Sequence, residues 1–583
     1  MKKMKLFSLN IILFIFLISK SKSLVEFQET LEQSQQLRAV WSSPWGGDAD
    51  LITFKSEEQF KQNMTYILDT LKMYNMNTLI YHVRTHNDAL YQSNLNPISP
   101  YFKEVDYNKF DPLKWLIDET HKRGIDFHAW MNPYRITSDP SIPIENILEK
   151  YKNYKDNPAS DKNYILNGVN SIVMDPGIEK VRTFIADTII EFLNKYDVEA
   201  IHFDDYFYDD MGAHGSTSVD KTILDEADQN TYIDYINTHP DCPYKVDNAT
   251  DKANWRRYQV DLLIILLKDK ISQYNKNNSK YVQFGISPTG IWKNGDGIVT
   301  YDDKGNAITT GSVTHGQEHY ASYLFCDTLK WCNEGWIDYL LPQNYFARTH
   351  PNAHFGNILD WWDKVLKYKK VNLYQGVGLY QADEEQYNRY SWQTDYYELY
   401  KDLQDTSSSN RTEGVSIYNF HTLRSLRDGL DKISSKQIEN GIKAWSKKVP
   451  LSEIKTFERI ILEAPKNVKF INSILSFDKV KGAKFYIIYR SKEEIKFTTD
   501  EIIDMFGNPE NKDRLEWKEN DEGDYKYGLR AISYTNSLGN TTTDIDYNPD
   551  PSDSTDHSDS DISYSKINII SYMGLCILLI LFF

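Results

Sequence analysis

The sequence predicts an α/β protein: a (β/α)8 TIM barrel followed by a C-terminal all-β sandwich-like domain. Short apolar runs alternate with amphipathic helical stretches, which is the pattern of a parallel sheet. Eight such units follow one another within residues 36–425, as a barrel with enlarged loops requires. Polar side chains gather at the ends of the apolar runs, and barrel strands end together at one mouth. An open doubly wound sheet is the alternative, but the glycine-rich first turn common in that fold is missing.

The expected strands are short and mostly apolar. They cover residues 37–43, 77–84, 126–135, 199–207, 282–290, 338–346, 372–380 and 414–420. The helical period and cap residues predict helices between them, over residues 60–75, 111–124, 177–197 and 321–335.

The chain changes character after the barrel. We expect a helical connector over residues 426–461, with a helix at 436–448. Residues 462–545 then show strand-like runs separated by turn signals, and this segment resembles a fibronectin type III sandwich. An irregular β-extension of the barrel is the alternative.

Both ends of the chain indicate export. Residues 1–23 combine a charged start, an apolar run and small residues, as in a signal peptide, with an uncleaved anchor as the alternative. Residues 546–566 predict an acidic, disordered spacer. Residues 567–583 are a hydrophobic tail with no basic residue after it, which favours a GPI signal over a plain membrane anchor. We therefore expect a secreted protein attached to the cell surface by a GPI anchor or a C-terminal transmembrane segment.

Charge, glycosylation sequons and cysteine content limit the partners and cofactors that the protein is expected to bind. The formal net charge of −17 argues against nucleic acid, which attracts basic surfaces. Glycosylation sequons, which fit secretion, begin at Asn63, Asn248, Asn277, Asn410 and Asn540. Outside the tail, at most one disulfide can form among Cys242, Cys326 and Cys332. No zinc-type cluster of Cys and His is present, and we expect no cofactor or metal.

Two adjacent carboxylates, Asp204 and Asp205, end the fourth expected strand in the segment IHFDDYFY at 201–208. Glycosidic cleavage needs one carboxyl group to protonate the leaving oxygen. A second one attacks, activates water or orients a substrate group that attacks. Adjacent carboxyl groups also separate their pKa values, so one stays protonated near neutral pH. We therefore expect this pair to be catalytic, with a Ca²⁺ or Mg²⁺ site or a purely structural pair as alternatives.

Other polar and aromatic residues near the strand ends are expected to bind the substrate. Aromatic faces stack on sugar rings, and arginines hold anionic or hydroxyl-rich groups by paired hydrogen bonds. The expected substrate-binding set is Arg84, Asp88, His128, Trp130, Asn132, Arg135, His202, Tyr206, Trp292, Gln343 and Tyr345.

Several segments resemble the glycosyl-hydrolase-like family ten barrel, in the same order, over residues 36–425. They are RAVW (38–41), HVR…NDALYQS (82–93), RGIDFHAWMNPYR (123–135), MDPGIEKVR (174–182), VEAIHFDDYFY (198–208), FGISPTGIW (284–292) and EGWIDYLLPQNYF (334–346). The resemblance implies a (β/α)8 fold and hydrolysis of glycosidic bonds, in a family that includes a bacterial peptidoglycan glycosidase. The family's FDDYFY motif matches Asp204 and Asp205.

One departure concerns the residues after that motif. Family members often continue with Pro, whereas this chain has Asp209, Asp210 and an insertion that runs to about residue 250. This loop borders the expected cleft, so substrate preference does not carry over from the family.

These observations favour an extracellular glycoside hydrolase acting on a polysaccharide that contains N-acetylhexosamine, such as peptidoglycan. Adjacent Asp pairs also resemble those of glycosidases in which the acetamido group of the substrate attacks. A non-catalytic surface lectin or adhesin on the same barrel is one alternative. A metal-dependent esterase or deacetylase that uses the Asp pair as ligands is another.

Overall fold

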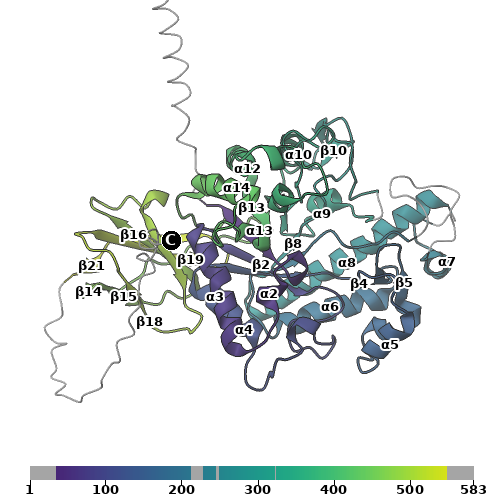
Figure 1. The fold of residues 1–583 in the computed structure, drawn as a ribbon, viewed down its shortest axis with the longest axis horizontal. Helices are drawn as coiled ribbons and strands as arrows, with labels where there is room; N and C mark the ends of the chain where they lie inside the picture. The colour runs from purple at the N-terminus through teal and green to yellow at the C-terminus, as the bar shows by residue number, and fades with distance from the viewer. Residues whose placement is uncertain (1–34, 212–226, 245–247, 322–323, 548–583) are drawn as a thin grey trace, which may run out of the picture.

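A closed parallel barrel forms the larger part of the protein, and a β-sandwich packs against one end of it (Figure 1). The computed structural model describes residues 35–211, 227–244, 248–321 and 324–547. The expected signal peptide at 1–23, the tail at 567–583 and all but the first two residues of the acidic spacer lie outside these residues. Among the described residues, none of the helices has the length and apolar character to cross a membrane.

Eight parallel strands close the barrel, in the order β1-β13-β12-β11-β8-β7-β3-β2. They are β1 (Leu37–Ser42), β2 (Thr78–Arg84), β3 (Asp126–Met131), β7 (Ala200–Phe203), β8 (Gln283–Ile286), β11 (Tyr339–Leu340), β12 (Asn372–Val377) and β13 (Thr412–Tyr418). Strand β1 pairs with both β2 and β13, which closes the sheet. The predicted fold class and all eight predicted strands are therefore confirmed.

Helices cover the outside of the barrel, between successive strands and after the last one. They are α3 (Glu57–Met73), α4 (Pro112–Lys122), α6 (Glu179–Leu193), α8 (Ala249–Asn278), α9 (Thr328–Glu334), α10 (Phe355–Val365), α12 (Glu398–Ser408) and α14 (Ile433–Gly441). The cap residues act as expected: the Asp111 side chain accepts a hydrogen bond from the Lys114 amide at 3.0 Å and starts α4.

Two helices differ most from their expected bounds. The helix expected at 321–335 begins only at Thr328, because the Asp327 side chain caps it by accepting from the Lys330 amide. The helix expected at 436–448 begins earlier, as α14, and continues as a short 3-10 turn over Ile442–Trp445.

Every residue of β1, β2, β3, β7, β8 and β12 is buried. A parallel strand between an inner and an outer layer has no solvent face, which explains the continuous apolar runs in the sequence. A small antiparallel sheet, β4 (Arg135–Thr137), β6 (Ile172–Met174) and β5 (Ile165–Asn167), follows β3 along the chain. Because β4 starts four residues after β3 ends, this sheet lies at the mouth of the barrel.

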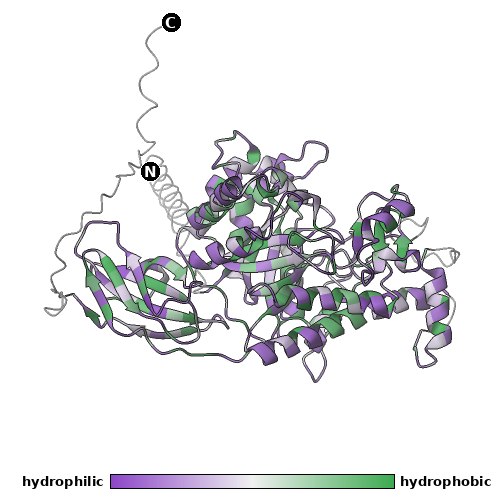
Figure 2. Cartoon of the chain, turned by 90° about the horizontal axis from the view of Figure 1, so that it is seen from below, coloured by the Kyte–Doolittle hydropathy of each residue, from purple (hydrophilic) through white to green (hydrophobic). Residues whose placement is uncertain are grey.

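The C-terminal part consists of two four-stranded sheets. One contains β18 (Arg514–Lys518), β15 (Ile474–Asp478), β14 (Val468–Ile471) and β21 (Ile545–Asp546). The other contains β17 (Ile502–Gly507), β16 (Ala483–Ser491), β19 (Lys526–Ser533) and β20 (Leu538–Thr542). Hydrophobic and hydrophilic residues alternate along these strands (Figure 2), as a sheet with one buried face requires. The predicted all-β part is confirmed, and its assignment to the fibronectin type III class stays a prediction.

The sandwich docks on the end of the barrel where the strands begin. Lys484 of β16 forms a buried ion pair with Asp126, the first residue of β3, at 2.7 Å. Gly124 lies so close to this face that a Cβ there would be 2.7 Å from the backbone carbon of Met505, and its φ of +69° also favours glycine. The sandwich therefore lies at the opposite end of the barrel from the mouth.

Cys242, Cys326 and Cys332 are free and buried in the structure. The single disulfide allowed by their number is not formed.

Candidate active site

A cleft of about 490 Å³ lies at the mouth of the barrel. Most of its walls come from residues at or just beyond the carboxyl ends of strands, where the chain leaves the barrel. The lining residues are Trp41, Trp45, Gly46, Gly47, Trp130, Asp204, Asp205, Tyr206, Gln343, Tyr345, Tyr380, Tyr418 and Asn419. Six of the residues singled out in the sequence meet here: Trp130, Asp204, Asp205, Tyr206, Gln343 and Tyr345.

Asp204 and Asp205 directly follow β7 and both line the cleft. The Asp204 carboxyl accepts two hydrogen bonds, from the Trp130 indole at 3.1 Å and from the backbone amide of Tyr206 at 3.1 Å. Asp205 is less deeply buried and accepts one from the Gln343 side-chain amide at 3.2 Å. These donors hold both carboxyl groups in fixed positions at the cleft wall.

The environment of the pair favours retention of a proton. Burial raises the pKa of Asp204 to about 7, the negative charge of Asp205 adds to this rise, and Arg135 opposes it. Burial also raises the pKa of Asp205, while its hydrogen bonds and Arg135 favour the ionised form. The Asp205 charge acts on Asp204, so Asp205 ionises first and Asp204 keeps its proton up to near neutral pH.

Aromatic rings form another part of the cleft wall. Trp41 lies 6.0 Å from the Tyr418 ring and 6.3 Å from the Tyr345 ring, measured between centroids, and Tyr345 stacks on Tyr418 at 5.6 Å. Tyr380 completes this wall. Such faces suit the apolar faces of sugar rings.

Two predicted substrate-binding histidines lie inside the barrel, below the cleft. The Trp41 indole donates to Nε2 of His202 at 3.1 Å, and the Tyr339 hydroxyl joins Nδ1 of His202 at 2.8 Å to Nδ1 of His128 at 3.1 Å. An indole N–H only donates, so Nε2 of His202 is the unprotonated acceptor. Burial lowers the pKa of both histidines, which agrees with neutral rings. They hold Trp41 in place and do not line the cleft.

His82 and Ser43 hold Trp130 in place. It stacks on His82 with the ring centroids 3.8 Å apart and the planes 4° from parallel. Nδ1 of His82 hydrogen-bonds the Ser43 hydroxyl at 2.8 Å. The Trp130 indole, which donates to Asp204, is therefore fixed by stacking on His82, and His82 is in turn fixed by its hydrogen bond to Ser43.

Five other predicted binding residues lie outside the cleft, and one of them, Arg135, stacks on the Tyr206 ring with its guanidinium carbon 3.6 Å from the ring centre. Arg84 is buried, and its guanidinium donates to the Asn132 and Pro133 carbonyls and to two Asn side chains. Asn132 itself donates to the Thr85 carbonyl at 3.0 Å. These bonds tie together the loops after β2 and β3, so both side chains are engaged within the protein.

Asp88 and Trp292 are also engaged elsewhere. Asp88 is buried in the loop after β2 and accepts from the Thr85 hydroxyl at 3.3 Å. Trp292 donates to Asp327 at 3.0 Å and stacks on Trp361, so its ring does not serve as a sugar platform in the cleft. A polar residue at the end of a strand is correctly predicted to lie near the mouth of the barrel. Whether its side chain reaches the cleft depends on which groups within the protein it contacts.

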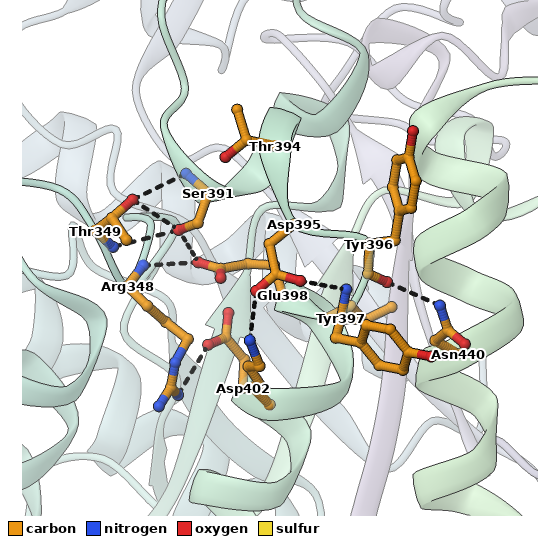
Figure 3. A network of polar contacts seen from close by, with 12 residues as sticks. Arg348, Thr349, Ser391, Thr394, Asp395, Tyr396, Tyr397, Glu398, Asp402 and Asn440 are labelled. Carbon is orange, nitrogen blue, oxygen red and sulfur yellow. Dashed lines mark hydrogen bonds and ion pairs between the residues drawn. The ribbon is translucent and has the colours of Figure 1, made fainter.

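A polar network secures the segment that carries Tyr345 (Figure 3). The Glu398 carboxylate accepts from the Arg348 amide at 2.6 Å and from the Ser391 hydroxyl at 2.8 Å. Next to Ser391, the Trp392 indole donates to the Tyr345 carbonyl at 2.9 Å. The aromatic wall of the cleft is thereby anchored to α12.

Sequence patterning does not single out Trp41, Trp45 and Tyr418, although the structure places all three in the cleft. Trp41 and Tyr418 lie opposite each other in the parallel register of β1 and β13, the first and last barrel strands. Their meeting depends on barrel closure, and an aromatic residue near a strand end is the only local signal. Among the described residues, no group of three or more His, Cys, Asp or Glu is arranged to hold a metal ion.

Comparisons with known proteins agree with this architecture. Residues 36–394 match the family described as glycosyl hydrolase-like 10. The chain is 32% identical over 385 residues to glycosyl hydrolase YngK of Bacillus subtilis (strain 168), covering 65% of this chain and 66% of that protein. It is 30% identical over 369 residues to glycosyl hydrolase DigH of Escherichia coli (strain K12), covering 61% of this chain and 76% of that protein. The chain thus spans slightly less than two thirds of the Bacillus relative.

Solved structures are more distant. The PgaB (BpsB) glycoside hydrolase domain from Bordetella bronchiseptica aligns with a TM-score of 0.40 and 10% identity, covering 68% of this chain and 98% of that chain.

Proposed function

This chain belongs to the glycosyl hydrolase-like 10 family, and we propose that its barrel is a glycoside hydrolase domain with Asp204 and Asp205 as its catalytic residues. The observation that carries this proposal is the pair of buried carboxyl groups with raised pKa values, set beside a wall of aromatic rings. Perturbed carboxyl pairs in a cleft are typical of acid–base sites.

The two carboxyl groups take different roles. Asp204 keeps its proton near neutral pH and donates it to the oxygen of the departing sugar. Asp205 is then ionised, and its charge assists the attack on the anomeric carbon, either directly or by orienting an acetamido group of the substrate. Gln343 holds the Asp205 carboxylate, and Trp130 holds Asp204.

The proposed substrate is a polysaccharide that contains N-acetylhexosamine, of the peptidoglycan type. Two adjacent carboxyl groups suit a reaction in which the substrate's own acetamido oxygen attacks, because one of them orients that group and the other is the acid. The test is incubation of the purified protein with peptidoglycan strands, chitin and hemicellulose, followed by mass spectrometry of the products. Release of products only from hemicellulose would contradict the proposed substrate.

The proposed cellular location is the cell surface after export. It is supported by the sequence pattern of residues 1–23 and of residues 567–583. Detection of the protein on intact cells with an antibody against the barrel tests it, and a signal that appears only after cell lysis would contradict it.

Trp130→Phe is expected to move the alkaline limb of the pH–activity profile upward by roughly one pH unit. The indole N–H stabilises the ionised form of Asp204, so its loss raises the pKa of this acid further. A hydrogen bond to a charged group contributes roughly 1.5 kcal/mol, and one pKa unit corresponds to about 1.4 kcal/mol. The measurement is kcat/KM against pH.

Trp292→Phe is the matched control, because it removes an indole N–H that donates to a half-buried Asp, Asp327, outside the cleft. Its alkaline limb should coincide with that of the unmodified protein. A downward shift in Trp130→Phe would show that Asp204 is not the acid.

A further inference from the structure

A second hollow of about 550 Å³ adjoins the active-site cleft. It is lined by Arg135 and Ser138 on one side, by Asn170 of the loop between β5 and β6, and by residues 206–210. Of the residues that line these two spaces, Tyr206 alone lines both. Asp204 and Asp205 line only the cleft.

Tyr206 and Arg135 form the boundary between the two spaces. The Arg135 guanidinium carbon lies 3.6 Å from the centre of the Tyr206 ring, and this ring is 44% exposed. The stacked pair therefore lies at the edge of the cleft, between the two spaces. The exposed face of Tyr206 can therefore contact a ligand that passes from one space into the other.

The floor of the second hollow is held rigidly. The Asp209 carboxylate accepts from the Ser171 amide at 2.7 Å, the Ser171 hydroxyl at 2.9 Å, and the backbone and side-chain amides of Asn170 at 3.0 and 3.1 Å. A Cβ at Gly168 would collide with this carboxylate. Asp209 therefore fastens the chain after Tyr208 to the small sheet, and its oxygens are occupied within the protein.

The chemistry of the hollow suits a polar, uncharged sugar unit. Its polar groups are the Ser138 hydroxyl, which also pairs with Nε2 of His86, the Asn170 side chain, which donates to Asp209, and the Arg135 guanidinium, which stacks on Tyr206. Asp209 and Asp210 place two carboxylates in the same wall, which disfavours an anionic group there.

We propose that this hollow is a second sugar subsite. The reacting unit lies in the cleft, where both carboxyl groups are, and a neighbouring unit of the same chain crosses Tyr206 into the hollow. The inference rests on the proposed function and extends it: the enzyme binds its polysaccharide across the barrel mouth and prefers oligosaccharides to single glycosides.

Ser138→Trp tests the subsite, because Ser138 is exposed and a large ring there occupies the hollow. The substrates are the N-acetylglucosamine hexamer, which spans both spaces, and an aryl N-acetylglucosaminide, which needs only the cleft. We expect KM for the hexamer to rise at least tenfold and turnover of the aryl glycoside to stay within twofold. Ser141→Trp, an exposed position three residues away and outside the hollow, should change neither value.

Binding separates failure of the subsite from failure of the proposed function. Titration calorimetry of the hexamer with the Asp204→Asn variant measures binding affinity and does not depend on turnover. Loss of affinity by at least tenfold on adding Ser138→Trp supports the subsite even if the protein cleaves neither compound. Equal hexamer affinity and equal KM with and without Ser138→Trp, in a variant that keeps its thermal unfolding temperature, would overturn it.

Discussion

Replacing Asp204 with Asn is expected to lower kcat/KM on the glycan substrate by roughly 10²–10⁴-fold, the range for loss of a general acid. The amide has almost the shape of the carboxyl group, and its oxygen can still accept from the Trp130 indole or the Tyr206 amide. It cannot deliver a proton to the leaving oxygen. The measurement is steady-state kinetics together with thermal unfolding, and the unfolding temperature should change little.

Asp327→Asn is a close control for this variant. Asp327 is also a carboxyl group whose pKa is raised by burial, and it accepts from an indole, that of Trp292, and from the Lys330 amide. It lies outside the cleft, and Asn is a good N-cap residue for α9. Its activity should stay within twofold of the unmodified protein. Equal activity losses in the two variants would point to general destabilisation and against a catalytic Asp204.

The second large effect is expected at the junction of barrel and sandwich. Lys484→Met should lower the free energy of unfolding by about 3–5 kcal/mol, as loss of one partner of a buried ion pair does. The two side chains are only 3% and 1% exposed, and the Lys484 ammonium also donates to Asn536. Burial and the nearby Glu199 already raise the pKa of Asp126 to about 7 despite the Lys484 charge, so removing this cation leaves a poorly solvated acid.

Urea unfolding measures this loss. Lys466→Met removes an exposed ion pair with Glu463 in the same part of the chain, and it should leave the free energy of unfolding nearly unchanged. The double variant Lys484→Met with Asp126→Leu should recover most of the stability, because no unpaired charge is left. A single Lys484→Met variant as stable as Lys466→Met would contradict a stabilising role for the buried pair.

The sequence predicted the barrel well because parallel strands are buried on both faces. Burial on both faces gives mostly apolar runs such as residues 78–84 and 126–131. Few folds other than a barrel contain eight such runs in alternation with helices. Asp204 and Asp205 were predictable for a related reason. They follow a buried strand directly, so the chain has to present them at the mouth.

Side-chain direction beyond the strand ends was not predictable. Arg84 looks like a ligand for a substrate, yet loop carbonyls use its donors. Trp292 looks like a sugar platform, yet it packs on Trp361. Tyr418 looks like an ordinary strand residue, yet barrel closure places it beside Trp41. These outcomes depend on contacts between segments that are far apart along the chain, which local patterns do not contain.

The neutral imidazoles around the cleft have a consequence for the heat of ionisation of the active site. Burial lowers the pKa of five histidines around the cleft, to about 3 for His86, His128 and His319 and well below its ordinary value for His82 and His202, so these imidazoles stay neutral where the two carboxyl groups titrate. Carboxyl ionisation absorbs almost no heat, whereas imidazole ionisation absorbs a good deal. The pH–activity limbs should therefore coincide at two well-separated temperatures, and a limb that moves down on warming would belong to a histidine.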